Sequence, residues 1–220
     1  MAKTSGGHSF NTRNKGQMIA VNTNGNRIST GKMTIIRNDA TSIKDMKNRD
    51  MQKELQQAMS RFHKVMGMRE RVVMLAPMDG AYGVTYIDGN GSHGIYLNSK
   101  YFDVPKKQFA ERYAKDNYNR RHGFKNTTRN PAQHTITHEL AHATWTSNYT
   151  GAAQRAAGIE IKALYKQFKN DKSSTRQKNY GSYGRSNVDE FWAEVITKAI
   201  HGDNDRYTRR ALAIAKRHKL

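Results

Sequence analysis

The chain contains no cysteine among its 220 residues. Disulfide bonds and thiolate ligands are therefore excluded, and any metal site must be built from histidine and carboxylate side chains. No apolar run approaches the length that a bilayer requires, so we expect no membrane span. Residues 1–8 lack an apolar core, so we expect no Sec-type signal peptide. This favours a cytoplasmic or virion-associated protein over a secreted one.

Acidic residues are scarce: 18 Asp and Glu stand against 38 Lys and Arg, which gives a net charge of +20 and a pI near 10.2. Such a surplus predicts attraction to polyanions. Residues 100–129 hold nine basic and three acidic residues, and residues 206–220 hold six basic and none acidic. The second segment predicts a helix with a basic face formed by Arg209, Arg210, Lys216 and Arg217. No aromatic-rich nucleic-acid motif accompanies it, so a solvated surface and association with nucleic acid, an acidic substrate or a virion interior remain equal alternatives.

The length and the composition favour one compact enzyme domain behind an amino-terminal extension. Hydrophobic residues make up 36% of the chain, which is low but enough for one core. Nothing between residues 50 and 220 has the composition of a linker. We therefore expect a domain over residues 50–220 and a polar, basic, partly flexible extension over residues 1–49. Within the extension, residues 17–21 and 32–36 predict a hairpin.

The hydrophobic pattern predicts an α+β fold with a small mixed sheet. Helical spacing of Met51, Leu55, Met59 (or Ala58) and Phe62 indicates a helix over residues 50–66 whose apolar side packs in the core. Three strand-like runs follow, at residues 71–76, 83–87 and 94–98. The remaining periodic segments predict helices over residues 105–118, 131–145, 152–169 and 187–196.

The most informative stretch is the run from His138 to His142, which has the pattern His-Glu-x-x-His. Histidines at positions i and i+4 lie on one face of a helix and can share a metal ion. Glu139 can reach a water molecule on that metal and act as its general base. Asn130 followed by Pro131 is a typical helix start. The sequence therefore predicts one Zn²⁺ per chain on this helix.

A catalytic zinc ion needs a third protein ligand. Glu190 and Glu194 are also i,i+4 partners, on a helix that begins with a capping-box-like pair, Ser186 and Asp189. Two like charges one turn apart on a largely apolar helix are costly unless a cation compensates them. We assign Glu190 as the third ligand and Glu194 as the carboxylate that orients a zinc-binding histidine through its free ring N–H.

The block from Tyr183 to Glu194 resembles the catalytic domain of anthrax lethal factor and the related Pro-Pro endopeptidases. In that family a tyrosine stands seven residues before the glutamate ligand, and a Glu-x-x-Ala-Glu segment follows, as here. The family's first motif usually reads His-Glu-Leu-Gly-His or similar, so Ala141 is a small departure from it. The resemblance extends from about residue 132 to residue 202.

The resemblance implies a zincin-like fold, with a small mixed sheet packed on the His-Glu-x-x-His helix and on a second helix that bears the glutamate. It implies His138, His142 and Glu190 as zinc ligands and Glu139 as general base. It further implies that Tyr183 donates a hydrogen bond to the oxyanion of the tetrahedral intermediate, a role that suits a neutral phenol. Tyr180 lies in the same loop, and only the spacing favours Tyr183 over it.

In zincins, the substrate commonly binds in extended form beside an edge strand near the zinc. As the last strand before the active-site helix, residues 94–98 are our candidate, with Gly94, Ile95 and Tyr96 as the substrate-binding residues. Residues 88–92 are expected to form a flexible loop over the cleft. His93 and His134 are expected to be surface or structural histidines rather than ligands.

The sequence thus predicts a zinc-dependent endopeptidase of the gluzincin type, with peptides or proteins as substrates. The alternative is a basic structural or nucleic-acid-associated protein, encoded by a phage or mobile element, that uses a metalloprotease fold with little or no turnover. The intact set of predicted site residues favours the enzyme.

Overall fold

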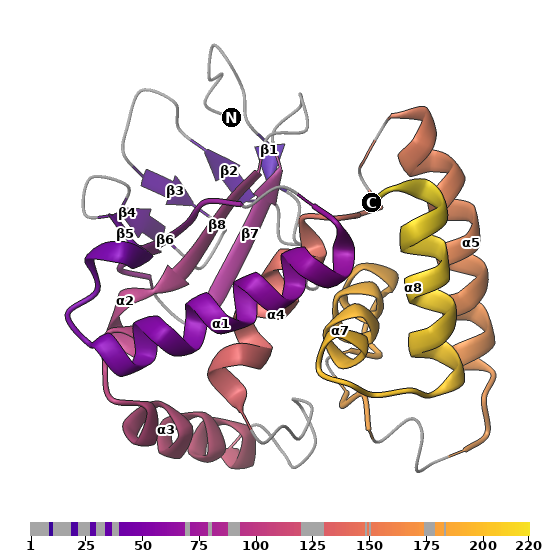
Figure 1. The fold of residues 1–220 in the computed structure, drawn as a ribbon. Coiled ribbons are helices and arrows are strands. Elements are labelled where there is room, and N and C mark those ends of the chain that lie inside the picture. The colour runs from indigo at the N-terminus through magenta and orange to yellow at the C-terminus, as the bar shows by residue number, and fades with distance from the viewer. Residues whose placement is uncertain are drawn as a thin grey trace.

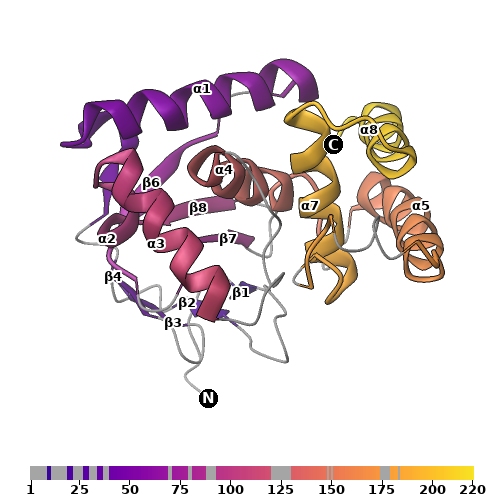
Figure 2. The same ribbon diagram turned by 90° about the horizontal axis from the view of Figure 1, so that it is seen from below.

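The computed structural model describes residues 9–10, 19–21, 27–29, 34–36, 40–68, 71–78, 81–87, 93–119, 130–147, 149, 151–173, 179–182 and 184–220. These residues form a mixed α+β fold, as the hydrophobic pattern predicts. A sheet lies to one side of helix α4, and helices α7, α5 and α8 lie to the other (Figures 1 and 2).

The main sheet has four strands: β5 (Thr41–Ser42), β6 (Val73–Ala76), β7 (Gly83–Ile87) and β8 (His93–Asn98), in the order β5-β6-β8-β7. β6 and β8 are parallel, whereas β7 is antiparallel to β8 and forms an edge. Three of the four strands coincide with the predicted runs within two residues.

The prediction that residues 94–98 form the edge strand is wrong. β8 has hydrogen-bonded neighbours on both sides, with Ile95 opposite Val73 of β6 and Thr85 of β7. Ile95 and Tyr96 are buried, and Gly94 lies opposite Tyr86. Their main-chain groups are therefore used within the sheet. The edge strand that contacts helix α4 is β7, because β8 follows β7 in the sequence but lies between β6 and β7 in the sheet.

Helix α1 (Arg49–Met66) crosses beside α4 and covers one side of the core (Figure 2). Asn48 caps its start by accepting a hydrogen bond from the backbone N–H of Met51, and Gly67 ends it with a φ of 65°. Its buried apolar residues include Met51, Leu55, Ala58 and Phe62. Of the two residues predicted for the third position, Ala58 is buried and Met59 only partly so. The short helix α2 (Ser99–Phe102) and helix α3 (Lys106–Asn119) follow β8.

The carboxyl-terminal half is helical: α4 (Pro131–His142), α5 (Ala152–Lys169), α7 (Val188–Ile200) and α8 (Arg206–His218). Trp145 and Trp192 pack edge to face, with ring centroids 6.3 Å apart, where α4 ends beside α7. The indole N–H of Trp192 donates to the Thr144 hydroxyl at 2.9 Å, and that of Trp145 donates to the Gln154 carbonyl at 3.0 Å. These anchors fix α7 against the end of α4.

The amino-terminal region contributes a second, antiparallel sheet in the order β1-β2-β3-β4, with β1 at Ser9–Phe10, β2 at Ile19–Val21, β3 at Arg27–Ser29 and β4 at Thr34–Ile36. The predicted hairpin between residues 17–21 and 32–36 is wrong in its pairing, because β3 lies between the two strands and pairs with both.

Upstream of residue 50, β5 pairs with β6, and Ile43 and Met46 belong to the main core. β1 also contacts β7.

Within the described part of the chain, no helix combines the length and the apolar character needed to cross a membrane.

A buried carboxylate ties together three of the helices. Glu54 of α1 accepts hydrogen bonds from Lys106 of α3, from the Asn130 amide at the start of α4, and from the Gln133 amide at 2.6 Å. Burial opposes ionisation of Glu54, but these three donors outweigh it and hold its pKa below the ordinary 4.5. Glu54 therefore helps to fix the position of α4 relative to α1.

We expect Glu54→Gln to lower the free energy of unfolding by about 1–3 kcal/mol at pH 7, because an amide cannot accept from all three donors. Since the pKa of Glu54 is lower in the folded state, its stabilisation is present above pH 4.5 and is lost as the pH falls through the folded-state pKa. Urea unfolding from pH 7 to pH 3 should show the two proteins converging. The exposed Glu111→Gln variant should show neither effect, and a constant difference across this range would contradict the assignment.

Candidate metal centre

Helix α4 begins where the sequence predicts. The Asn130 side chain accepts from the backbone N–H of Gln133 at 3.2 Å, and Pro131 occupies the first turn. The helix lies between β7, α1 and α7, so nearly every side chain from Ala132 to His142 is buried. A helix with both apolar and polar sides buried must pair its polar groups internally, because an unpaired buried polar group costs free energy.

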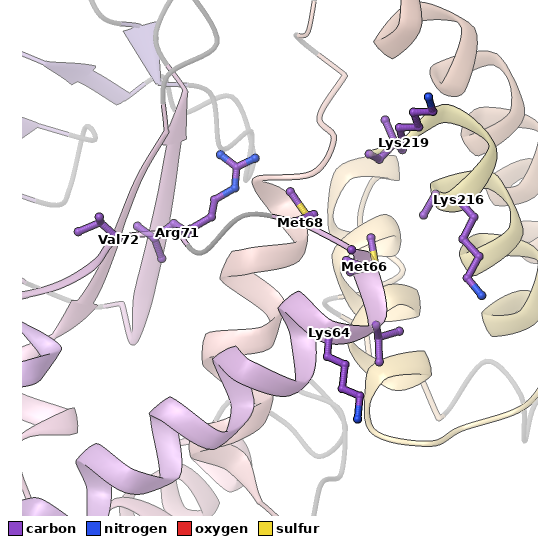
Figure 3. Close-up of a pocket in the computed structure, with 12 residues that line it drawn as sticks. Lys64, Met66, Met68, Arg71, Val72, Lys216 and Lys219 are labelled. Atoms are coloured by element: carbon purple, nitrogen blue, oxygen red, sulfur yellow. The ribbon is translucent and has the colours of Figure 1, made fainter.

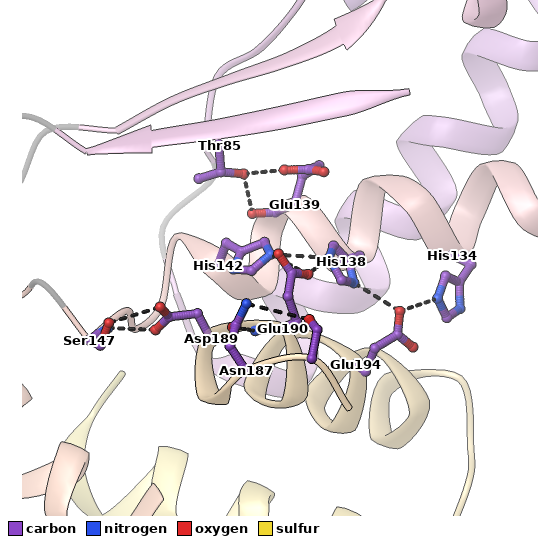
Figure 4. Close-up of polar contacts among 11 residues, drawn as sticks. Thr85, His134, His138, Glu139, His142, Ser147, Asn187, Asp189, Glu190 and Glu194 are labelled. Carbon is purple, nitrogen blue, oxygen red and sulfur yellow. Dashed lines mark hydrogen bonds and ion pairs between the residues drawn. The ribbon is translucent and has the colours of Figure 1, made fainter. Parts of the chain in front are cut away.

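Helix α7 supplies hydrogen-bonding partners for the buried polar side chains of α4. Asn187 caps it by accepting from the backbone N–H of Glu190 at 2.9 Å, rather than the predicted Ser186. Asp189 accepts from the backbone N–H and the hydroxyl of Ser147, at 2.6 and 2.8 Å, and thus ties α7 to the segment after α4. These contacts direct Asp189 away from the histidines and leave Glu190 and Glu194 facing them (Figure 4).

The predicted ligands converge. Glu190 Oε2 lies 3.1 Å from His138 Nε2 and 3.4 Å from His142 Nε2, and the two Nε2 atoms are 3.1 Å apart. Ligands about 2.0–2.2 Å from a tetrahedral metal lie about 3.4 Å from one another. The three atoms are therefore spaced as ligands of one metal ion, and all three residues are buried. His138, His142 and Glu190 form a group that could hold a metal, as the sequence predicts.

The electrostatics of this group favour a cation. Burial favours the neutral form of His138, yet hydrogen bonds and attraction from Glu190 and Glu194 outweigh burial and raise the pKa of His138 well above 6.5. Burial likewise opposes ionisation of Glu190, but His142 and His138 lower its pKa to about 2. Two buried carboxylates thus stabilise positive charge between the helices. A divalent metal on the three converging atoms would meet the same requirement.

Glu194 binds the other side of His138. Its Oε1 lies 3.1 Å from His138 Nδ1 and 3.2 Å from His134 Nε2. A ring N–H from each histidine satisfies this oxygen, and these contacts lower the pKa of Glu194 well below 4.5 in spite of its burial. With its Nδ1 proton directed at Glu194, a neutral His138 would have the lone pair of Nε2 free for a metal ion.

His134 is structural, as predicted, but it is buried rather than solvated. Its ring stacks beside His201 at 6.2 Å between centroids. His134, His138 and Glu194 form a second group that could hold a metal. The two groups share His138, and in both of them the side chains also lie within hydrogen-bond distance of one another. The signal that marks His134 in the sequence is its position one turn before His138, on the same face of α4.

Glu139 lies on the side of α4 that faces the sheet (Figure 4). The Thr85 hydroxyl of β7 lies 2.7 Å from both the carbonyl and the Oε2 of Glu139. Burial raises the pKa of Glu139, and Glu190 adds to this, against the opposing effects of His138, His142 and Thr85. The carboxyl group is thus held at the edge strand, next to the metal group, with an increased affinity for a proton.

Two glycines, neither of them singled out from the sequence, make room for the carboxylates. A Cβ at Gly83 of β7 would stand 2.8 Å from Cγ of Glu139, and one at Gly184 would stand 2.7 Å from Cγ of Glu194. Neither glycine has a positive φ, so the need is for space rather than for backbone conformation. Sequence spacing alone does not reveal such contacts between distant segments.

Tyr183 lies outside the described residues, so its predicted role stays a prediction. The competing Tyr180 is fully buried among Phe168, Phe191 and Tyr207, and its hydroxyl donates to Asp205 at 3.0 Å. This engagement favours a role for Tyr180 in the core. The predicted loop at residues 88–92 and the side chain of His93 also lie outside what is described.

No protein-family model, curated protein or solved structure matches this chain. The resemblance to the lethal factor family therefore rests on the motif residues alone.

We expect Gly83→Ala to lower the free energy of unfolding by about 1–3 kcal/mol, because the added methyl group must displace Glu139 or Leu97. Metal binding should persist, since the substitution touches no ligand. Thermal unfolding and metal analysis measure the two effects. Gly151→Ala is a suitable control, because the atom nearest its new methyl group is the end of the Gln154 side chain, which can move. Equal stability of the Gly83→Ala protein and the wild type would contradict the tight packing of Gly83 against Glu139.

Proposed function

We propose that the protein is a zinc-dependent endopeptidase of the gluzincin type. The observation that carries the proposal is the convergence of His138, His142 and Glu190 at 3.1–3.4 Å, with Glu139 beside them on the neighbouring face of the same helix. Two imidazoles and one carboxylate, with no thiolate in the chain, are the ligand set of catalytic zinc sites in hydrolases. The proposed family is that of the lethal factor catalytic domain and the Pro-Pro endopeptidases.

The residues around His138, His142 and Glu190 would have separate roles in peptide hydrolysis. A zinc ion, when bound, would polarise the scissile carbonyl and lower the pKa of a water molecule. Glu139 would remove a proton from that water and pass it to the leaving amine. Because burial raises the pKa of Glu139, its carboxyl group takes up a proton more readily than an exposed glutamate, which suits a group that accepts a proton and passes it on. Glu194 keeps His138 in the tautomer that ligation requires.

We propose β7, rather than β8, as the strand beside which a peptide substrate lies. β7 has a hydrogen-bonded sheet neighbour on one side only among the described strands, although β1 contacts it as well, and its Thr85 touches the proposed general base. An extended peptide added to this edge would be held by main-chain hydrogen bonds that tolerate many sequences. Tyr183 remains our candidate for the donor to the oxyanion, on the basis of the seven-residue spacing alone.

The ligand assignment predicts one zinc ion per chain in the wild-type protein. His142→Ala and Glu190→Ala should each remove the metal and lower the melting temperature together, because a ligand that binds only the folded state stabilises it. Metal analysis and thermal unfolding with and without a chelator measure both effects. The partly exposed Glu160→Ala should leave the zinc content unchanged.

A chelator should lower the melting temperature of wild type but not that of the two ligand variants. Full zinc occupancy in the Glu190→Ala protein would remove Glu190 from the ligand set and would make Glu194, which already contacts two histidines, the next candidate.

The chemical assignment predicts that Glu139→Gln keeps the fold and the zinc ion but loses peptide hydrolysis by about 10²–10⁴-fold, because only the proton acceptor is removed. Cleavage of an unbiased peptide library, read by mass spectrometry, measures this. If the zinc-loaded wild type were as inactive as the variant, the alternative of a metalloprotease fold without turnover would replace the enzyme.

A further inference from the structure

Helix α5 exposes far more positive than negative charge, because Glu160 is its one acidic residue and is only partly exposed. Its exposed residues are alanines, Gln167, Ile159 and four basic residues: Arg155, Lys162, Lys166 and Lys169. The spacing of seven, four and three residues places the four cations along one stripe of the helix. At 1.5 Å per residue the stripe is about 21 Å long.

Helix α8 continues this pattern. Six of its residues are exposed, and five of them are basic: Arg206, Arg209, Arg210, Lys216 and Arg217, with Ala213 as the sixth. α8 packs against α5 on the side of the molecule away from the sheet (Figures 1 and 2). We call the exposed surface of these two helices the basic layer.

The two helices run antiparallel, and two ion pairs hold the layer in register. Glu160 of α5 binds Arg217 at 2.6 Å, and Asp171 beyond the end of α5 binds Arg206 at 2.8 Å. Within the part of the chain that the structure describes, no carboxylate pairs with five other cations of the layer, which are Lys162, Lys166, Arg209, Arg210 and Lys216. The charge of these five side chains is therefore available to a partner.

The cationic surface extends past the end of α8 into a pocket of about 890 Å³ (Figure 3). Lys216 and Lys219 line it from α8, and Lys64 and Arg71 line it from the opposite wall. Burial lowers the pKa of Arg71, and no carboxylate of the described residues pairs with its guanidinium. Positive charge from three separate segments is therefore concentrated at this end of the layer.

We propose that the basic layer binds nucleic acid through the phosphodiester backbone, independently of base sequence. A stripe of about 21 Å is as long as about six phosphates of one strand at 3.4 Å each. Because the alanine side chains between the cations are short, the sugar-phosphate backbone of a nucleic acid can approach the helix closely.

Other polyanionic partners fit the layer less well. Ile159 is the one large apolar side chain exposed on these two helices, so the layer offers no apolar face for insertion into a membrane. An acidic protein partner would need apolar or aromatic anchor pockets for affinity. The exposed residues of the two helices provide none, and the apolar side chains of the pocket, such as Met66, Met68 and Val72, lie beyond the layer. The absence of exposed aromatic residues from the two helices also favours contacts with phosphates over stacking with bases.

The proposal goes beyond peptide hydrolysis, because no residue of the basic layer belongs to the metal group. The test uses the full-length protein and a fluorescein-labelled 20-base-pair DNA duplex of arbitrary sequence, followed by fluorescence anisotropy from 50 to 200 mM salt. The layer variant combines Lys162→Gln, Lys166→Gln, Arg209→Gln and Lys216→Gln. A matched control removes the same number of charges elsewhere, through Lys47→Gln, Lys53→Gln, Lys107→Gln and Lys115→Gln, all exposed.

We expect wild type to bind the duplex, and the affinity to fall steeply with salt as counterions are released. The layer variant should bind at least about 30-fold more weakly at 50 mM salt, with a log–log salt slope shallower by about 0.9 for each phosphate that the variant no longer neutralises. The control should change the affinity by less than about threefold. Zinc content and melting temperature should remain those of wild type in both variants.

Three results would overturn the proposal: no binding by wild type at 50 mM salt, equal decreases in affinity for the layer and control variants, or displacement of the duplex by polyglutamate at equal charge concentration. The second would mean that the net charge acts diffusely, and the third would point to an acidic protein partner. Since the assay measures binding alone, its outcome is separate from that of the zinc and cleavage experiments.

Discussion

The interaction on which the site depends is the contact between two carboxylates of α7 and the histidines of α4. Glu190 and Glu194 are one helical turn apart and both buried, an arrangement that repulsion and desolvation would make strongly unfavourable on an isolated helix. It becomes favourable only because each carboxylate meets two imidazoles: Glu190 meets His138 and His142, and Glu194 meets His138 and His134. The two helices must therefore pack in one register, and His138 is the residue that both carboxylates share.

The surrounding structure serves to hold that register. Asp189 binds Ser147 and so holds the start of α7. Trp145 and Trp192 pack against each other where α4 ends beside α7, and Glu54 fixes the start of α4 against α1. On the neighbouring face of α4, β7 approaches so closely that a Cβ at Gly83 would stand 2.8 Å from Cγ of Glu139. The position of the proposed general base is thus determined by the sheet, and that of the proposed ligands by α7. The proposed general base and the proposed metal ligands are therefore held in place by different elements of the fold.

Local patterns are sufficient to predict the helices and the ligand group. The i,i+4 spacing of His138 with His142, and of Glu190 with Glu194, depends only on helix geometry, and the Asn-Pro start of α4 depends only on capping. Strand order is not predictable in the same way. Whether residues 94–98 or 83–87 form the edge depends on which strand the chain inserts beside β6, and both runs have similar composition. The burial of His134 and the two tight glycines escape prediction because they arise from contacts between segments far apart in the sequence.

The distribution of charge separates the interior from the surface. The site holds three carboxylates and three histidines, whereas the excess of Lys and Arg lies outside it, and part of that excess is exposed on α5 and α8. A field from +20 charges would oppose the binding of a divalent cation if it reached the site undiminished. Two effects limit it: exposed charges are screened over about 8 Å at physiological ionic strength, and the surrounding histidines keep the buried carboxylates Glu190 and Glu194 ionised. The carboxylates buried around the histidines therefore do more than supply a ligand, because they make a locally negative site within a strongly basic protein.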